Sequence, residues 1–200
     1  MAQRDEEAMR GYMANEARID ATRDKYALPE GYVEDQSSPW IPLYANAAIK
    51  YLSFDIRSNS VVDVFWVQAG GQLGRHRHRG SVSGYTLEGS WRFLEYDWTA
   101  RPGDFVVESP GRTHTMFSDS GMKALFWLHG PIEYLDPEGR ITRVADVFSF
   151  IDHYTRHCEA SGTAVNEKLF LKGTGTVPPG LIEILFPNER WCFCPLIRPR

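Results

Sequence analysis

Two histidines, His76 and His78, lie one residue apart in a run in which histidine alternates with arginine (residues 75–79). Successive side chains of an extended strand point to opposite faces, so both imidazoles would project to one side and the guanidinium groups to the other. A third histidine, His114, follows a Pro-Gly turn and opens another short run with the pattern of a strand. Three neutral imidazoles held by strands can bind a divalent metal ion and leave coordination positions open for other ligands. The spacing therefore predicts a metal site formed by His76, His78 and His114.

One acidic residue, Glu108, lies close enough in sequence to join this site. Glu108 is six residues before His114 and would share its face along an uninterrupted strand, although Pro110 and Gly111 intervene. A carboxylate beside a metal ion can orient a ligand histidine or accept the proton that a bound substrate releases. Glu108 is therefore the candidate catalytic residue, and the alternative is a surface salt bridge.

The surrounding sequence has the pattern of an all-β fold. From residue 48 onward, short runs that alternate apolar and polar residues are separated by turns rich in glycine and proline. Apolar residues then recur at helical spacing from residue 146 to about residue 160. The pattern predicts a small antiparallel β-barrel of the jelly-roll type, preceded by a charged N-terminal arm and followed by a helix. The expected segments are the arm (1–45), the barrel (46–140), the helical segment (141–171) and a tail of unknown role (172–200).

Composition argues against several classes of function. The formal net charge of −4 disfavours a general nucleic-acid-binding protein, which needs a strongly electropositive face. No apolar run approaches membrane-spanning length, and the first residues lack the apolar core of a signal peptide, so a cytoplasmic location is expected. The six Trp, nine Tyr and eleven Phe residues suit a barrel with an apolar cavity. Tyr85, Trp91 and Trp127 are candidate walls of that cavity, with ordinary buried packing as the alternative for each.

The three histidines belong to two motifs that resemble those of the cupin family. The first motif spans residues 70–89 and carries the histidine pair between two glycines, and the second spans residues 103–114 and ends with the third histidine. Val82, or Ser83 if the gap is counted one residue longer, stands where many cupins have a metal-binding glutamate, so the resemblance implies a site with three histidine ligands. Ser109 and Ser118 are further departures, because cupins usually have proline and asparagine at these positions.

Other segments are similar to those cupins that cleave carbon–carbon bonds in ketones. The similar segments are residues 85–91, 95–98, 108–111 and 114–115, and the resemblance runs from about residue 32 to about residue 171. The chain most resembles the 2,4'-dihydroxyacetophenone dioxygenases, with the acetylacetone-cleaving dioxygenases as more distant relatives. The resemblance implies an Fe(II) cofactor, dioxygen as co-substrate, and cleavage of an aromatic hydroxyketone to 4-hydroxybenzoate and formate. The resemblance to cupins also implies a homodimer or a homotetramer.

Two other readings stay open, because cupins host many unrelated functions. One is a non-catalytic cupin that holds zinc at the same three histidines, like the sensor domain of zinc-dependent anti-sigma factors, with the arginines of residues 75–79 marking a protein-docking face. The other is a different cupin enzyme, such as a metal-dependent isomerase or a dioxygenase that acts on another diketone or on a flavonol. The sequence does not identify the bound metal, since a site of three histidines also accepts zinc, nickel or copper.

Overall fold

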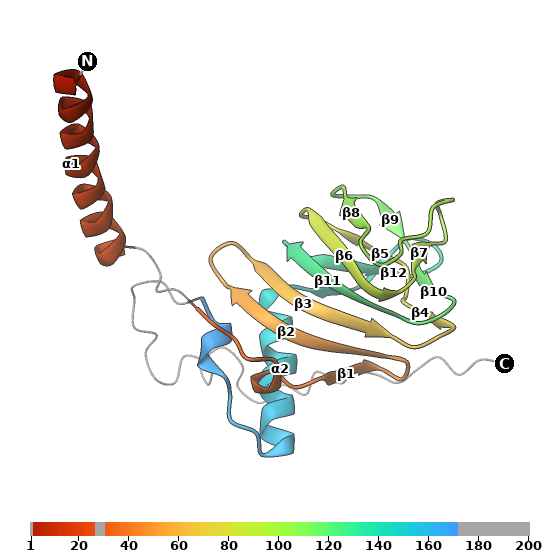
Figure 1. Cartoon of the computed structure of the whole chain (residues 1–200). Helices are drawn as coiled ribbons and strands as arrows, with labels where there is room; N and C mark the ends of the chain where they lie inside the picture. Colours follow the sequence, from red (N-terminus) through yellow and green to blue (C-terminus); the bar gives the residue numbers. More distant parts are fainter. Residues whose placement is uncertain (1, 27–30, 172–200) are drawn as a thin grey trace. The chain divides into compact units, whose positions relative to one another are not determined.

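The computed structural model describes residues 2–26 and 31–171, which fall into two parts that are described separately. The first part is a single polar helix, α1 (Ala2–Tyr26), within the segment expected to form an N-terminal arm (Figure 1). The second part holds the strands and the helix α2 (Val147–Ser161). Among the described residues, no helix combines the length and the apolar character needed to cross a membrane.

The second part contains thirteen strands and two short 3-10 helices, at Asp35–Ser37 and Glu167–Leu169. All the pairs between these strands are antiparallel, as expected when short turns join neighbouring strands. The strands are β1 (Ile41–Tyr44), β2 (Ala47–Asp55), β3 (Ser60–Val67), β4 (Gly71–Gln72), β5 (His76–His78), β6 (Val82–Gly89), β7 (Arg92–Phe93), β8 (Phe105–Glu108), β9 (Thr113–His114), β10 (Met116–Ser118), β11 (Met122–His129), β12 (Ile132–Leu135) and β13 (Ile141–Ala145).

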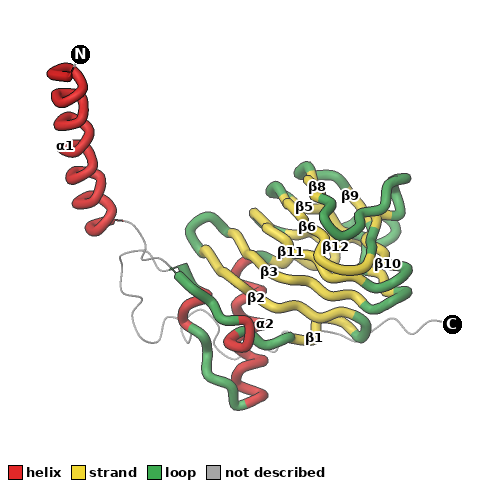
Figure 2. Tube along the Cα trace, viewed as in Figure 1, coloured by secondary structure: helices red, strands yellow, loops and turns green. Residues whose placement is uncertain are grey.

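These strands form three sheets that enclose the core (Figures 1 and 2). The largest sheet has the order β1-β2-β3-β11-β6-β8, and the second has the order β13-β12-β5-β9. A third sheet of three short strands has the order β4-β10-β7. The predicted mostly-β fold with one late helix is confirmed, although the strands do not join into one continuous closed barrel.

Two strands lie outside the segment expected to form the barrel (46–140). The first is β1, which pairs with β2, so that the expected boundary at residue 45 lies in the turn between two paired strands. The second is β13, which pairs with β12 at the start of the segment expected to be helical. Their exposed or half-buried residues lack the clear alternation that marks a strand in sequence. The expected tail, residues 172–200, lies outside the described residues.

Helix α2 has defined ends and one buried face. The side chain of Asp146 accepts a hydrogen bond from the backbone N–H of Ser149, and the hydroxyl oxygen of Ser149 accepts one from the backbone N–H of Asp146. At the other end, Gly162 adopts the left-handed conformation that terminates the helix. The buried face includes Phe150 and Tyr154, and the helix packs against β2, β3 and β13. This packing explains the helical spacing of apolar residues in the sequence, and it brings Phe150 to the wall of an internal cavity.

Candidate metal centre

The strand β5 presents its histidines and its arginine to opposite sides, as the alternation in the sequence predicts. His76 and His78 are 7% and 5% exposed, whereas Arg77 is half-buried. Strand β9 pairs with β5 so that His114, which is 1% exposed, lies directly opposite His76. Residues directly opposite each other on antiparallel strands have neighbouring side chains, so the pairing itself places the third imidazole beside the first two.

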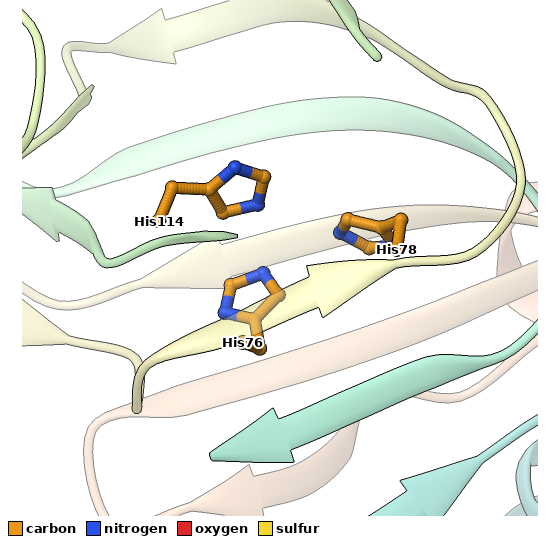
Figure 3. Close-up of side chains that lie close together, drawn as sticks. All are labelled: His76, His78 and His114. Atoms are coloured by element: carbon orange, nitrogen blue, oxygen red, sulfur yellow. The ribbon is translucent and has the colours of Figure 1, made fainter. Parts of the chain in front are cut away.

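The three rings surround a common space (Figure 3). One ring nitrogen from each histidine can act as a ligand atom, and these three atoms all lie within 4.8 Å of one another. The Nδ1–H group of His76 donates a hydrogen bond to the carbonyl oxygen of Gly74 at 2.8 Å, which leaves the lone pair of Nε2 for a metal ion. The ring of His114 stacks on Phe93, with the centroids 3.9 Å apart. These contacts fix the orientation of two of the three rings.

Burial keeps His76 and His78 in the neutral form that metal binding requires. Burial and the neighbouring rings of His78 and His114 lower the pKa of His76 to about 3. Burial and the ring of His114 likewise lower the pKa of His78 to about 3. Both side chains are therefore neutral at pH 7 and can donate a lone pair to a cation.

Glu108, at the end of β8, is buried beside the histidines and is not part of a surface salt bridge. Its side chain is 4% exposed, and its Oε2 atom lies 3.3 Å from Nε2 of His78 and 3.2 Å from Nε2 of His114. Neither contact has the geometry of a hydrogen bond, and within the described chain both Glu108 Oε2 and His114 Nε2 are buried without a hydrogen-bond partner. Buried polar atoms without partners are costly, and a cation between them would satisfy both. The donor set therefore fits a divalent metal ion.

The outer side of β5 is held by an acid that sequence reasoning missed. The carboxylate of Glu133, on β12, accepts hydrogen bonds from Nε of Arg77 at 2.6 Å and from Nε of Arg79 at 2.8 Å. Hydrogen bonds from Arg79 and Arg77 hold the pKa of Glu133 below its usual value. The two arginines thus tie β5 to β12 and support the strand that carries the histidine pair.

The histidines and Glu108 lie between two cavities. The first is lined by His76, His78, Glu108 and mostly apolar side chains, among them Phe65, Phe126 and Phe150. About 70 Å³ of it is open to the centre of a water molecule, well above the roughly 10–15 Å³ that one water needs. The second cavity is lined by His114 and Glu108 together with Phe93, Tyr96, Trp98 and Arg112. A ligand could therefore reach the histidines from either side.

The three aromatic residues expected to form cavity walls lie elsewhere, and neither of the two cavities is lined by any of them. Tyr85 and Trp127 are 44% and 52% exposed, on the face of the large sheet that points away from the cavity. Trp91 is fully buried, and its Nε1–H group donates a hydrogen bond to Thr86 Oγ1 at 2.9 Å. Trp127 points outward because side chains alternate between the two faces of a strand, and its neighbours Phe126 and Leu128 on β11 point inward.

Comparisons with known proteins agree with this fold. An RmlC-like cupin protein from Ralstonia eutropha JMP134 is 27% identical, with a TM-score of 0.69 over 73% of this chain and 98% of its own. A second protein of that organism, with a cupin-like fold and unknown function, is 18% identical, with a TM-score of 0.65 over 73% of this chain and 93% of its own. Acetylacetone dioxygenase from Acinetobacter johnsonii is 19% identical, with a TM-score of 0.57 over 64% of this chain and 93% of its own.

A search of curated protein sequences finds no match. The family model described as the ChrR cupin-like domain matches residues 29–133, which include the two glycine-flanked motifs and all three clustered histidines. The chain therefore belongs to the ChrR cupin-like family.

Proposed function

We propose that this protein is an Fe(II)-dependent dioxygenase that cleaves a carbon–carbon bond of an aryl hydroxymethyl ketone. The proposed reaction converts 2,4'-dihydroxyacetophenone and dioxygen into 4-hydroxybenzoate and formate. The observation that carries the proposal is the convergence of three buried imidazoles on one common space. The resemblance of residues 85–91 and 108–111 to ketone-cleaving cupins supports the substrate class, and the fold shared with acetylacetone dioxygenase is consistent with it.

His76, His78 and His114 would hold the iron, which when bound supplies the electrons that activate dioxygen. The three imidazoles add no negative charge, so the site favours a substrate that binds as an anion through its ketone and hydroxyl oxygens. The apolar side chains of the first cavity exclude water and limit the ways in which the ketone can lie. The protein's contribution is therefore ligand geometry, orientation and a dry site.

We assign to Glu108 the role of accepting the proton that the substrate loses. Its Oε2 atom lies within 3.3 Å of the Nε2 atoms of His78 and His114 and has no hydrogen-bond partner among the described residues. A hydroxyl group of a substrate bound at the histidines would come within reach of this oxygen, and a carboxylate can accept its proton. In this reading Glu108 is a general base beside the metal and not one of its ligands.

The position of Glu108 also favours a second candidate function, a non-catalytic zinc-binding protein. If Oε2 of Glu108 bound the metal together with the three histidines, the site would have four protein ligands. Closed four-ligand zinc sites are structural, whereas catalytic sites keep a position for water or substrate. The two functions thus differ in whether Glu108 coordinates the ion.

Metal analysis and oxygen uptake separate the candidates. The purified full chain, loaded with Fe(II) under nitrogen, would be mixed with a panel of aryl hydroxyketones, diketones and a flavonol, and oxygen consumption and products would be measured on admitting air. We expect one oxygen consumed per molecule of 2,4'-dihydroxyacetophenone cleaved, with formate released. Formation of products without oxygen would refute the dioxygenase proposal. Tight zinc binding with no oxygen uptake on any compound would favour the non-catalytic function.

A further inference from the structure

A second carboxyl group lines the cavity, apart from the histidines. Asp63 lies in the middle of β3, at an inward-facing position between the buried Val61 and Phe65. It is 2% exposed, and its side chain forms part of the wall of the first cavity. Within the described part of the chain, its carboxyl group makes no hydrogen bond and no ion pair. Asp63 is therefore a buried polar group turned toward an internal space without a protein partner.

The neighbours of Asp63 do not explain its presence. Tyr51 lies opposite it on β2, but the Tyr51 hydroxyl is 2.9 Å from Nδ1 of His153. Since Nε2 of His153 lies 3.1 Å from the carbonyl oxygen of Pro42, it donates there and Nδ1 accepts from Tyr51. The partner opposite Asp63 on β11 is Phe126, which is apolar. A carboxyl group in such surroundings lowers stability unless something occupies the cavity and bonds to it.

The surroundings also set the chemistry that Asp63 offers to a ligand. Burial raises the pKa of Asp63 well above its usual value, which favours the neutral carboxyl form. A neutral carboxyl group has one hydroxyl donor and one carbonyl acceptor, so it suits a ligand hydroxyl better than a cation or an anion. The aromatic rings of Phe65 and Phe126 line the same cavity and would pack against a flat apolar body.

Asp63 and the histidine pair lie on different sheets, β3 in the largest sheet and β5 in the second, and both line the same cavity. We infer that Asp63 is a specificity-determining residue that hydrogen-bonds a hydroxyl group on the part of an aromatic ligand remote from the histidines. This inference rests on the proposed function for the orientation of the ligand, with its ketone end at the histidines. In that orientation, Asp63 selects ring-hydroxylated aryl ketones over unsubstituted ones.

Two variants test the inference on the full-length chain. Asp63→Asn keeps a carbonyl acceptor and nearly the same volume, and Asp63→Leu removes all hydrogen bonding. Thr86→Val is the matched control, because Thr86 is also fully buried but accepts a hydrogen bond from Trp91 and lines neither cavity. Without ligand, we expect Asp63→Leu to melt at the same or a higher temperature than wild type, and Thr86→Val to melt at a lower one. A large loss of stability or failure to fold in Asp63→Leu would assign Asp63 a structural role and overturn the inference.

Ligand binding by calorimetry uses two matched pairs. The first, phenol and benzene, needs no metal; the second, 2,4'-dihydroxyacetophenone and 2-hydroxyacetophenone, is measured on the Fe(II)-loaded chain under nitrogen. We expect the hydroxylated member of each pair to bind wild type and Asp63→Asn about tenfold more tightly or better, and Asp63→Leu to lose that preference. Phenol that binds no better than benzene, or a preference that survives in Asp63→Leu, would overturn the inference.

The two pairs distinguish failure of this inference from failure of the proposed function. A phenol preference that depends on Asp63, without binding or turnover of either ketone, would support the role of Asp63 and refute the proposed substrate. Turnover of the ketones with no dependence of the hydroxyl preference on Asp63 would leave the proposed function standing and refute the role of Asp63.

Discussion

Replacing Glu108 with glutamine tests how the buried carboxylate acts on the metal site. The change keeps the shape of the side chain and removes its charge. Glu108 Oε2 lies 3.3 Å from Nε2 of His78, and two unit charges at a separation of about that size would interact by about 5 kcal/mol at an effective dielectric constant of about 20. Most of this energy is offset by the cost of keeping the carboxylate away from water. We therefore expect the metal affinity to fall by only about 10–100-fold, as for other groups that support metal ligands.

The effect of Glu108→Gln on turnover should be larger than its effect on binding. Loss of a general base typically slows a reaction by about 10²–10⁴-fold, so the iron-saturated variant should retain its metal and turn over slowly. The assay measures metal content by elemental analysis and turnover by oxygen uptake at saturating iron. Glu88→Gln is the control, because Glu88 is an exposed acid that pairs with Lys123 at 3.0 Å. Unchanged turnover would refute the role of Glu108 as a base, and complete loss of metal would identify it as a ligand.

Three further predictions follow from the site and the sheet. His114→Ala should abolish metal binding while the protein stays folded, as judged by elemental analysis and circular dichroism; retained stoichiometric metal would contradict the three-histidine site. The metal-free protein should lose stability as the pH falls from about 6.5 to about 3, because the unfolded chain then binds protons that His76 and His78 cannot accept while folded. Chemical denaturation across this range measures the free energy of unfolding, and a free energy that does not change with pH would contradict the prediction. Trp127→Glu, at a 52% exposed position on the outer face of the large sheet, should lower the mass of the expected homodimer or homotetramer measured by light scattering; a monomeric wild type would contradict that expectation.

Strand parity located His76 and His78 because the relevant information is local. His76 and His78 are two residues apart on one strand, and the side-chain period of a strand places them on one face. His114 was found through its motif and not through parity, and the pairing of β9 with β5 provides its position opposite His76. Glu108 does lie beside the histidines, as expected. Strand parity does not explain this position, however, because β8 ends at Glu108 and a turn separates it from β9.

Residues whose role depends on pairing between distant strands could not be found in the same way. Glu133 meets Arg77 only because β12 pairs with β5, and no local pattern indicates this. Trp127 was a candidate wall of the cavity, and only the alternation of buried and exposed residues along β11 shows that Phe126 faces inward and Trp127 outward. Asp63 could have been noticed in the sequence, since it is an acid in a strand whose other residues, apart from Ser60 at its start, are apolar.

The central claim is that His76, His78 and His114 bind one metal ion and leave coordination positions open. X-ray absorption spectroscopy of the Fe(II)-loaded chain under nitrogen, before and after addition of 2,4'-dihydroxyacetophenone, tests it most directly. We expect three imidazole nitrogens bound to the iron, together with oxygen ligands that change when the ketone is added. A shell of four protein ligands that includes a carboxylate and does not respond to the ketone would contradict it.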